Sequence, residues 1–284
     1  MLSSDRCLWY IEITNNILRR DRMTAYEVPK VWRWEDENSS KGGNRPTAGS
    51  RFEQKLPVGE APFQLYSLGT PNGIKVTIML EELKELGVED ADYDLYKIDI
   101  GEGDQFGSDF VEINPNSKIP ALVDQSQSPR LEIFESGSIL LYLAEKFNQL
   151  LPDDIQERTE TLNWLFWQIG AGPFVGGGFG HFFAYAPEPM KYPIDRFTME
   201  TKRQLDLLDK ILADRAYIAG NRYTIADIAI WSWYGQLALD RLYEGSYEFL
   251  DLAEYPQLLE WAKRIAERPG VQRGLAAEYQ PIGE

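Results

Sequence analysis

The stretch from residue 63 to residue 87, FQLYSLGTPNGIKVTIMLEELKELG, combines a strand, a turn and a helix. Residues 63–67 alternate in the manner of a strand, and residues 69–73 have the composition of a turn. Apolar side chains then recur at helical spacing, at Val76, Met79, Leu80, Leu83 and Leu86. Gly87 is expected to end this helix. The turn therefore lies where the carboxyl end of a strand meets the N-terminus of a helix.

The elements that follow complete an α/β domain. Residues 93–98 predict a second strand, which makes a β-α-β unit with the first stretch. Residues 120–123 and 131–134 predict a hairpin, and a helix over residues 135–148 follows directly. The order β-α-β and then β-β-α is typical of a thioredoxin-like fold. We therefore expect a thioredoxin-like domain over residues 59–149.

The second half of the chain predicts only helices. Strand patterns end before Pro152, so we expect an all-α domain over residues 150–284. The predicted helices cover residues 156–167, 194–212, 224–239 and 256–267. A glycine-rich segment, residues 170–180, is interpreted as a kink or loop because glycine disfavours a regular helix. Thr224 and Asp227 form a variant of the capping box, in which side chains satisfy the amides at a helix start.

The N-terminal part of the chain has a different character. Residues 1–22 form a leader that we expect to be disordered, or mis-assigned with Met23 as the start, because polar residues interrupt its apolar stretch. Residues 23–58 are polar and predict an extended arm. Trp32 and Trp34 lie close together in this arm, which suggests that the arm packs against another part of the protein.

Composition and charge exclude several classes of function. The chain has 284 residues and a formal net charge of −16, which repels nucleic acids and anionic membranes. No apolar run approaches the roughly 18 to 20 residues of a membrane span. The only cysteine is Cys7, which excludes an intrachain disulfide or a protein dithiol and favours a reducing compartment such as the cytoplasm. The only histidine, His181, is flanked by phenylalanines, so we expect a packed, hydrogen-bonded side chain and no metal site.

The turn before the first helix could stabilise an anion. Thr70 and Asn72 are expected at a helix N-terminus, where free amides and the helix dipole favour negative charge. The hydroxyl and the amide could donate hydrogen bonds to a thiolate and so lower the pKa of a thiol. Ordinary turn and cap chemistry explains the same residues, so the neighbouring motifs must decide between these interpretations.

Two later motifs predict a peptide-binding site. Pro120 introduces a strand, a position that often carries a cis peptide bond and leaves the N–H and C=O of Ile119 for a peptide ligand. Glu135 offers a carboxylate for an ammonium group, and the helix that begins at Ser136 offers amides for a carboxylate. This pair of charges matches the amino-acid end of a γ-glutamyl peptide.

Several motifs together are similar to those of the cytosolic glutathione transferase superfamily. They are SKIPAL at residues 117–122, ESGSILLYL at 135–143 and TIADIAIW at 224–231. A narrower resemblance is to the bacterial nu class, relatives of the yeast nitrogen-catabolite regulator that reduce disulfides with glutathione. The motifs that carry it are LYSLGTPNG at 65–73, GDQF at 103–106 and FGHF at 179–182. The likeness runs from about Lys30 to the last helix.

The resemblance implies a role for each site residue. Thr70 and Asn72 would contact the sulfur of glutathione, and Ile119 would pair with its cysteinyl backbone. Glu135 and Ser136 would hold the γ-glutamyl end. The remaining polar parts of glutathione would contact Asn44 in the arm, Gln105, Lys118 and Arg196. Surface positions for Lys118 and Arg196, and a plain loop role for Gln105, remain alternatives.

The resemblance also implies a function. We expect a homodimeric enzyme that uses glutathione as co-substrate to reduce small disulfides or organic hydroperoxides, with weak transferase activity and no catalytic cysteine. Two glutathione molecules would share one site. Conventional conjugation of electrophiles and a regulatory protein that only binds glutathione are the alternatives. Tyr66 is assigned to packing rather than thiol activation, and residues 176–183 either pack or form the acceptor pocket.

Overall fold

The computed structural model describes residues 26–34 and 42–283. The chain divides into two compact units, residues 1–39 and 40–284. In the first unit Trp32 is 62 % exposed and Trp34 is half-buried, and the packing of the arm stays a prediction. The predicted leader, residues 1–22, lies outside the described residues, and so does Cys7.

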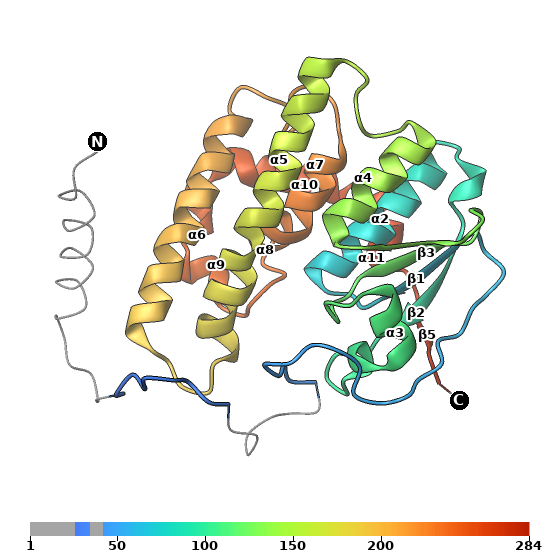
Figure 1. Ribbon diagram of the computed structural model, residues 1–284. Coiled ribbons are helices and arrows are strands. Elements are labelled where there is room, and N and C mark those ends of the chain that lie inside the picture. Colours follow the sequence, from blue (N-terminus) through green and yellow to red (C-terminus); the bar gives the residue numbers. More distant parts are fainter. Residues whose placement is uncertain (1–25, 35–41, 284) are drawn as a thin grey trace, which may run out of the picture. The chain divides into compact units, whose positions relative to one another are not determined.

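A mixed sheet of five strands organises the α/β part of the second unit (Figure 1). The strands are β1 (Phe63–Ser67), β2 (Tyr93–Lys97), β3 (Ala121–Asp124), β4 (Leu131–Phe134) and β5 (Gln280–Pro281), in the order β4-β3-β1-β2-β5. β1 is parallel to β2 and antiparallel to β3, and β3 and β4 form the predicted hairpin. β5 lies parallel to β2 and was not predicted, because two residues are too few to show an alternating pattern.

Helices cover both faces of this sheet. They are α2 (Pro71–Glu85), α3 (Ser108–Ile113) and α4 (Ser136–Phe147), with short 3-10 turns at η2 (Glu89–Ala91) and η3 (Asp104–Phe106). Phe63 and Leu65 of β1 point into the main core with α2 and α4. Tyr66 points to the other face, where Phe110 of α3 packs. The alternation of β1 thus separates two apolar layers and confirms the predicted thioredoxin-like order.

The helical part begins after Pro152, as predicted. Its helices are α5 (Ile155–Pro173), α6 (Lys191–Leu212), α7 (Ile225–Ile230), α8 (Gln236–Ala238), α9 (Ser246–Phe249), α10 (Pro256–Ala266) and α11 (Pro269–Leu275), with a 3-10 turn at η6 (Leu252–Glu254). Trp231 and Trp261 are fully buried in its core. No helix within the described ranges is long and apolar enough to cross a membrane.

The glycine-rich segment is helical, which corrects the prediction of a kink or loop. It forms η4 (Phe174–Tyr185), a π-helix that continues directly from α5. A Cβ at Gly176 would lie 2.4 Å from the Trp233 ring, and one at Gly180 would lie 2.2 Å from Tyr243. These glycines permit a close approach of neighbouring rings, and that packing outweighs their low helix propensity. A second π-helical turn, η5 (Trp231–Gly235), carries Trp233.

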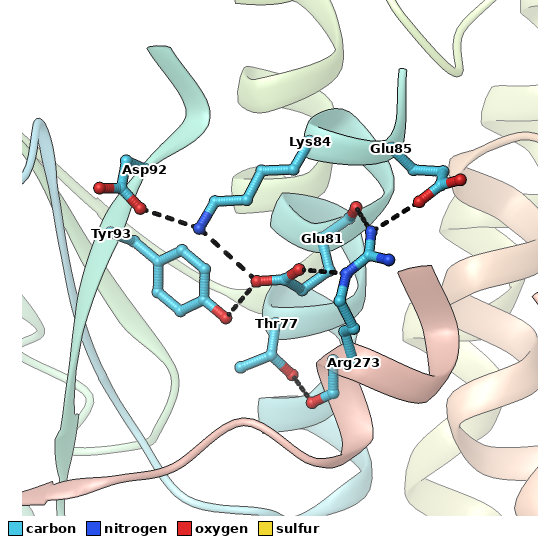
Figure 2. A network of polar contacts seen from close by, with 8 residues as sticks. Thr77, Glu81, Lys84, Glu85, Asp92, Tyr93 and Arg273 are labelled. Carbon is cyan, nitrogen blue, oxygen red and sulfur yellow. Dashed lines mark hydrogen bonds and ion pairs between the residues drawn. The ribbon is translucent and has the colours of Figure 1, made fainter. Parts of the chain in front are cut away.

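The C-terminal segment returns to the α/β part, where α11 packs against α2. Figure 2 shows Arg273 of α11 between Glu81 and Glu85 of α2, with nitrogen to oxygen distances of 2.9 and 2.8 Å. Thr77 of α2 donates a hydrogen bond of 2.7 Å to the carbonyl of Gly274. A chain segment about two hundred residues away thus holds the helix that begins at the predicted anion-binding turn.

The capping box at Thr224 is confirmed and is larger than predicted. Asp227 accepts hydrogen bonds from the N–H of Thr224 and from the N–H of Ile218, each 3.0 Å long. The indole of Trp261 donates a further bond of 3.0 Å to the same carboxylate. Asp227 is fully buried. The box therefore joins α7 to the preceding loop and to α10.

Candidate functional site

A cavity of about 570 Å³ lies between the start of α2, the start of α4 and the helical part. It brings together four of the predicted site residues, Thr70, Asn72, Glu135 and Ser136. The opposite wall comes from α5 and the two π-helical segments, through Gln168, Gly172, Gly176, Gly177, Tyr185 and Trp233. The two halves of the chain therefore build one site.

Thr70 is the N-cap of α2, and its hydrogen bonds leave a donor for the cavity. Its Oγ1 accepts the N–H of Gly73 at 3.2 Å, and its carbonyl accepts the N–H of Ile74 at 2.9 Å. Since the hydroxyl oxygen is used as an acceptor, its proton remains to be donated. Pro71 has no N–H, and the hydrogen bonds within the described ranges provide no acceptor for the N–H of Asn72. An anion here would meet two donors at a positive helix end.

The side chain of Asn72 is oriented from the helical part. The indole Nε1–H of Trp233 donates to Asn72 Oδ1 over 2.9 Å. The amide oxygen is thereby occupied by a donor, so the NH₂ group of Asn72 is the part left for a ligand. Sequence reasoning missed Trp233 because it lies 161 residues from Asn72 and no local pattern connects the two.

The start of α4 forms the second half of the predicted site. Glu135 is exposed and adopts a left-handed φ of 68°, while Ser136 is 5 % exposed. A positive φ costs a residue other than glycine of the order of 1–3 kcal/mol and often marks a functional position. The bend turns the chain abruptly from β4 into α4, so that both residues line the cavity.

Lys75 is a site residue that sequence reasoning missed. It is 0 % exposed and lines the cavity from α2. Its Nζ donates to Ser136 Oγ over 3.1 Å and to Gln168 Oε1 over 2.6 Å. Burial lowers the pKa of Lys75 to about 7, although the negative charge of Glu135 acts in the opposite direction. The sequence did offer one signal for this residue: Lys75 is the only charged side chain in the largely apolar first turns of the predicted helix.

Two of the remaining predicted residues, Asn44 and Lys118, lie at a second cavity of about 450 Å³. Lys118 donates to Asn44 Oδ1 over 2.8 Å, and both residues line this cavity. Ile119 precedes a cis peptide bond to Pro120, as predicted. Gln105 is 4 % exposed and donates to the carbonyl of Gly42 over 3.2 Å, and its Oε1 has no partner among the described residues.

Three further assignments have different outcomes. Arg196 is exposed on α6 and lines neither cavity, so its role stays a prediction. His181 is exposed rather than packed inside, because the π-helix turns it outward beside the ring of Phe182. Tyr66 is buried, stacks on Tyr96 and donates to the carbonyl of Pro57 over 2.7 Å, which fits the packing role. Within the described ranges no group of three potential metal ligands is present.

The fold and the cavity define a class of protein. A thioredoxin-like domain is followed by helices, and a cavity lies at the N-terminus of α2, the first helix after β1. Family models for the glutathione S-transferase N-terminal and C-terminal domains match residues 61–145 and 192–264. The chain belongs to the glutathione transferase family and is a glutathione-dependent enzyme of that family.

Individual relatives are similar over most of their length. Disulfide-bond oxidoreductase YghU from Escherichia coli is 59 % identical, with 88 % of this chain and 87 % of the relative covered. The crystal structure of glutathione transferase YghU from Streptococcus pneumoniae, complexed with glutathione, is 65 % identical. It superposes with a TM-score of 0.89 over 91 % of this chain and 100 % of that one. A family member from Pseudomonas fluorescens with two glutathione bound is 39 % identical, with a TM-score of 0.69, covering 75 % and 92 %.

Proposed function

We propose that this enzyme reduces small disulfides and organic hydroperoxides with glutathione, without a protein cysteine. The observation that carries the proposal is the pair of donors at the start of α2, the hydroxyl of Thr70 and the amide of Asn72, beside the carboxylate of Glu135 and the hydroxyl of Ser136. One end of the cavity suits a thiolate and the other suits a zwitterionic γ-glutamyl group. The similarity to an oxidoreductase named for disulfide bonds supports the same reaction.

The reaction needs two glutathione thiols and no other reductant. A first thiolate attacks one sulfur of the disulfide, forms a mixed disulfide and releases the other half as a thiolate. A second glutathione thiolate attacks the glutathione sulfur of the mixed disulfide, which yields glutathione disulfide and the second product thiol. With a hydroperoxide, the first thiolate becomes a sulfenic acid as the alcohol leaves, and the second thiol condenses with it and releases water.

We also propose that both glutathione molecules occupy this cavity. Gly177 lines it without a side chain, and a Cβ there would meet no atom within 4 Å, which leaves open space in this wall of the cavity. A relative from Pseudomonas fluorescens holds two glutathione molecules, which supports the arrangement. The wall formed by Tyr185 and Tyr243 would then face the acceptor disulfide.

The proposal predicts that Cys7→Ala leaves glutathione-dependent reduction of a model disulfide unchanged. Cys7 is the only cysteine of the chain, so the variant removes every protein thiol. The measurement compares initial rates of the folded variant and the natural enzyme at equal glutathione concentration. Loss of activity in a folded Cys7→Ala protein would contradict the mechanism.

The choice among activities is tested by comparing rates on a disulfide, an organic hydroperoxide and an aryl halide. The proposal expects the first two to be favoured and conjugation to be weak. If the aryl halide reacts fastest, the enzyme is a conventional transferase. Turnover that is negligible on all three, together with tight glutathione binding, would instead indicate a regulatory protein.

Trp233→Phe is expected to raise the pKa of the bound glutathione thiol. Phenylalanine keeps the ring but cannot donate to Asn72 Oδ1, so the amide can turn an oxygen toward the sulfur. Since the thiolate is the reactive form, the acid limb of the pH–rate profile should move to higher pH, with little change in KM for glutathione.

The matched control for this variant is Trp167→Phe, whose indole packs on Tyr234 and does not line the cavity. In an Asn72→Ala background Trp233→Phe should have no further effect on the pH profile. An equal shift in that background would show that Trp233 acts by packing alone.

We propose further that the enzyme is a homodimer of the reducing cytoplasm, where glutathione is kept as the thiol. Phe166 is 63 % exposed beside an apolar groove of about 330 Å³ that Leu141, Leu165 and Ile169 also line. Coverage by a second copy would remove this apolar surface from water. The groove adjoins Glu135, so such an interface would lie next to the glutathione site.

A further inference from the structure

The ammonium group of Lys75 is buried without a counter-ion in hydrogen-bonding contact. Its two acceptors, Ser136 Oγ and Gln168 Oε1, are both uncharged, and the ion pairs of the described residues do not include it. Buried charged groups are usually paired with an opposite charge, as Glu82 of the same helix is. Its buried carboxylate pairs with Arg268 through two hydrogen bonds of 2.8 and 2.6 Å. Burying an unpaired charge is costly, so an anion that reaches Lys75 would be bound favourably.

The surroundings of Lys75 direct its charge toward the cavity. Because Ser136 Oγ accepts from Lys75, the hydroxyl proton of Ser136 must point elsewhere, and Ser136 lines the cavity. The first amides of α4 lie at the same place and also attract negative charge. On the other side Gly172 leaves room for Gln168, since a Cβ there would lie 2.7 Å from Gln168 Nε2. A ligand carboxylate in the cavity beside Ser136 would therefore accept from its hydroxyl and from the first amides of α4, and would balance the charge of Lys75.

We propose that Lys75 is the counter-ion for the α-carboxylate of the γ-glutamyl group and acts through Ser136. The inference rests on the proposed function, because it takes glutathione as the ligand. Lys75 thereby sets ligand specificity: it selects a peptide with an α-carboxylate at this end. It also links the two halves of the chain, because Gln168 of α5 holds the same ammonium.

Binding of the carboxylate should be coupled to proton uptake. The charged group that acts on Lys75 is Glu135 at the start of α4, while its contacts on α4 and α5, Ser136 and Gln168, are neutral. The free enzyme has a lowered pKa of about 7 at Lys75. A bound carboxylate favours the ammonium form and raises that pKa. Above pH 7 binding therefore takes up a proton at Lys75, and below it the proton is already present.

The test combines a protein variant with a ligand variant. Calorimetry measures the affinity of S-methylglutathione, which has no thiol to titrate, and of its analogue with 4-aminobutyrate in place of the γ-glutamyl group, which lacks only the α-carboxylate. For the natural enzyme, loss of the carboxylate should weaken binding about tenfold or more. Lys75→Met should bind both probes with similar, low affinity. The control Lys84→Met, on the exposed side of the same helix, should discriminate as the natural enzyme does.

Proton uptake gives an independent measurement. Titrations at a pH above the pKa of Lys75, in buffers with different ionisation enthalpies, should show uptake for the natural enzyme and for Lys84→Met but not for Lys75→Met. Lys75→Gln, which keeps a hydrogen-bond donor without charge, replaces Lys75→Met if the latter fails to fold.

Three results would overturn the proposal, and a fourth would overturn the proposed function. A folded Lys75 variant that still discriminates between the probes, or one that loses the same factor for both, shows that Lys75 serves only the architecture. If the natural enzyme binds neither probe and does not use glutathione, the proposed function itself fails. Binding of both probes with equal affinity by the natural enzyme refutes only the role of Lys75.

Discussion

Replacing both Thr70 and Asn72 with alanine should lower kcat/KM for glutathione-dependent disulfide reduction by about a hundredfold or more. Under the proposed function, each side chain donates a hydrogen bond to the sulfur from the N-terminus of α2, with a hydroxyl proton or an NH₂ group that the structure leaves for the cavity. Hydrogen bonds to an ionised partner contribute roughly 1.5–3 kcal/mol each, and both are lost in the double variant. The backbone amide of Asn72 and the helix dipole remain, so some thiol activation should persist.

The decisive measurement separates ionisation from binding. Ultraviolet absorbance of the bound thiolate, followed against pH, should show a raised thiol pKa in the double variant. Affinity for S-methylglutathione should largely remain, because the proposal assigns the other end of the ligand to Glu135 and Ser136, which also line the cavity. Thr77→Ala is the control, since Thr77 lies on the same helix and bonds to Gly274 away from the cavity. An unchanged thiol pKa with a lowered rate would refute the role assigned to these donors.

Asp227→Ala should lower the free energy of unfolding by about 3–5 kcal/mol. The buried carboxylate accepts bonds from the backbone of Ile218 and Thr224 and from the indole of Trp261. Alanine leaves these donors buried without an acceptor and removes the Asp227 half of the capping box of α7, while the N-cap Thr224 remains. Denaturant unfolding of the variant measures the effect. Asp206→Ala, which removes an exposed pair with Lys210, should change stability by less than about 1 kcal/mol.

The same residue predicts a pH dependence of stability. Burial raises the pKa of Asp227 from 3.8 to about 6 in the folded protein, even though its hydrogen bonds oppose the shift. A raised pKa means that the folded state holds the proton more tightly, so this contribution is present below pH 4 and is lost as pH rises through about 6. Asp227→Asn cannot titrate, and the stability difference between it and the natural protein should vary over this interval. A constant difference would contradict the shift.

Local sequence patterns predicted most of the elements and four of the residues that line the cavity, Thr70, Asn72, Glu135 and Ser136. The strand, turn and helix from Phe63 onward, the hairpin and the capping box at Thr224 depend on contacts within a few residues. The cis bond before Pro120 was predicted for the same reason. Several elements were missed, among them α3, α9 and α11. β5 is too short for a pattern, and the glycines of η4 were taken as breakers. Their conformation is decided by partners elsewhere in the chain.

The turn that carries Thr70 and Asn72 shows where sequence and tertiary structure divide. The sequence by itself determined that Thr70 and Asn72 lie at the start of a helix beside a strand end, because a helix cap depends on neighbouring amides. Only the tertiary structure decided which of their atoms are left for the cavity. Trp233 turns the amide of Asn72 from 161 residues away, and Lys75 is buried against Gln168, 93 residues further on. Such contacts arise from packing of the two halves of the chain, and no local pattern encodes them.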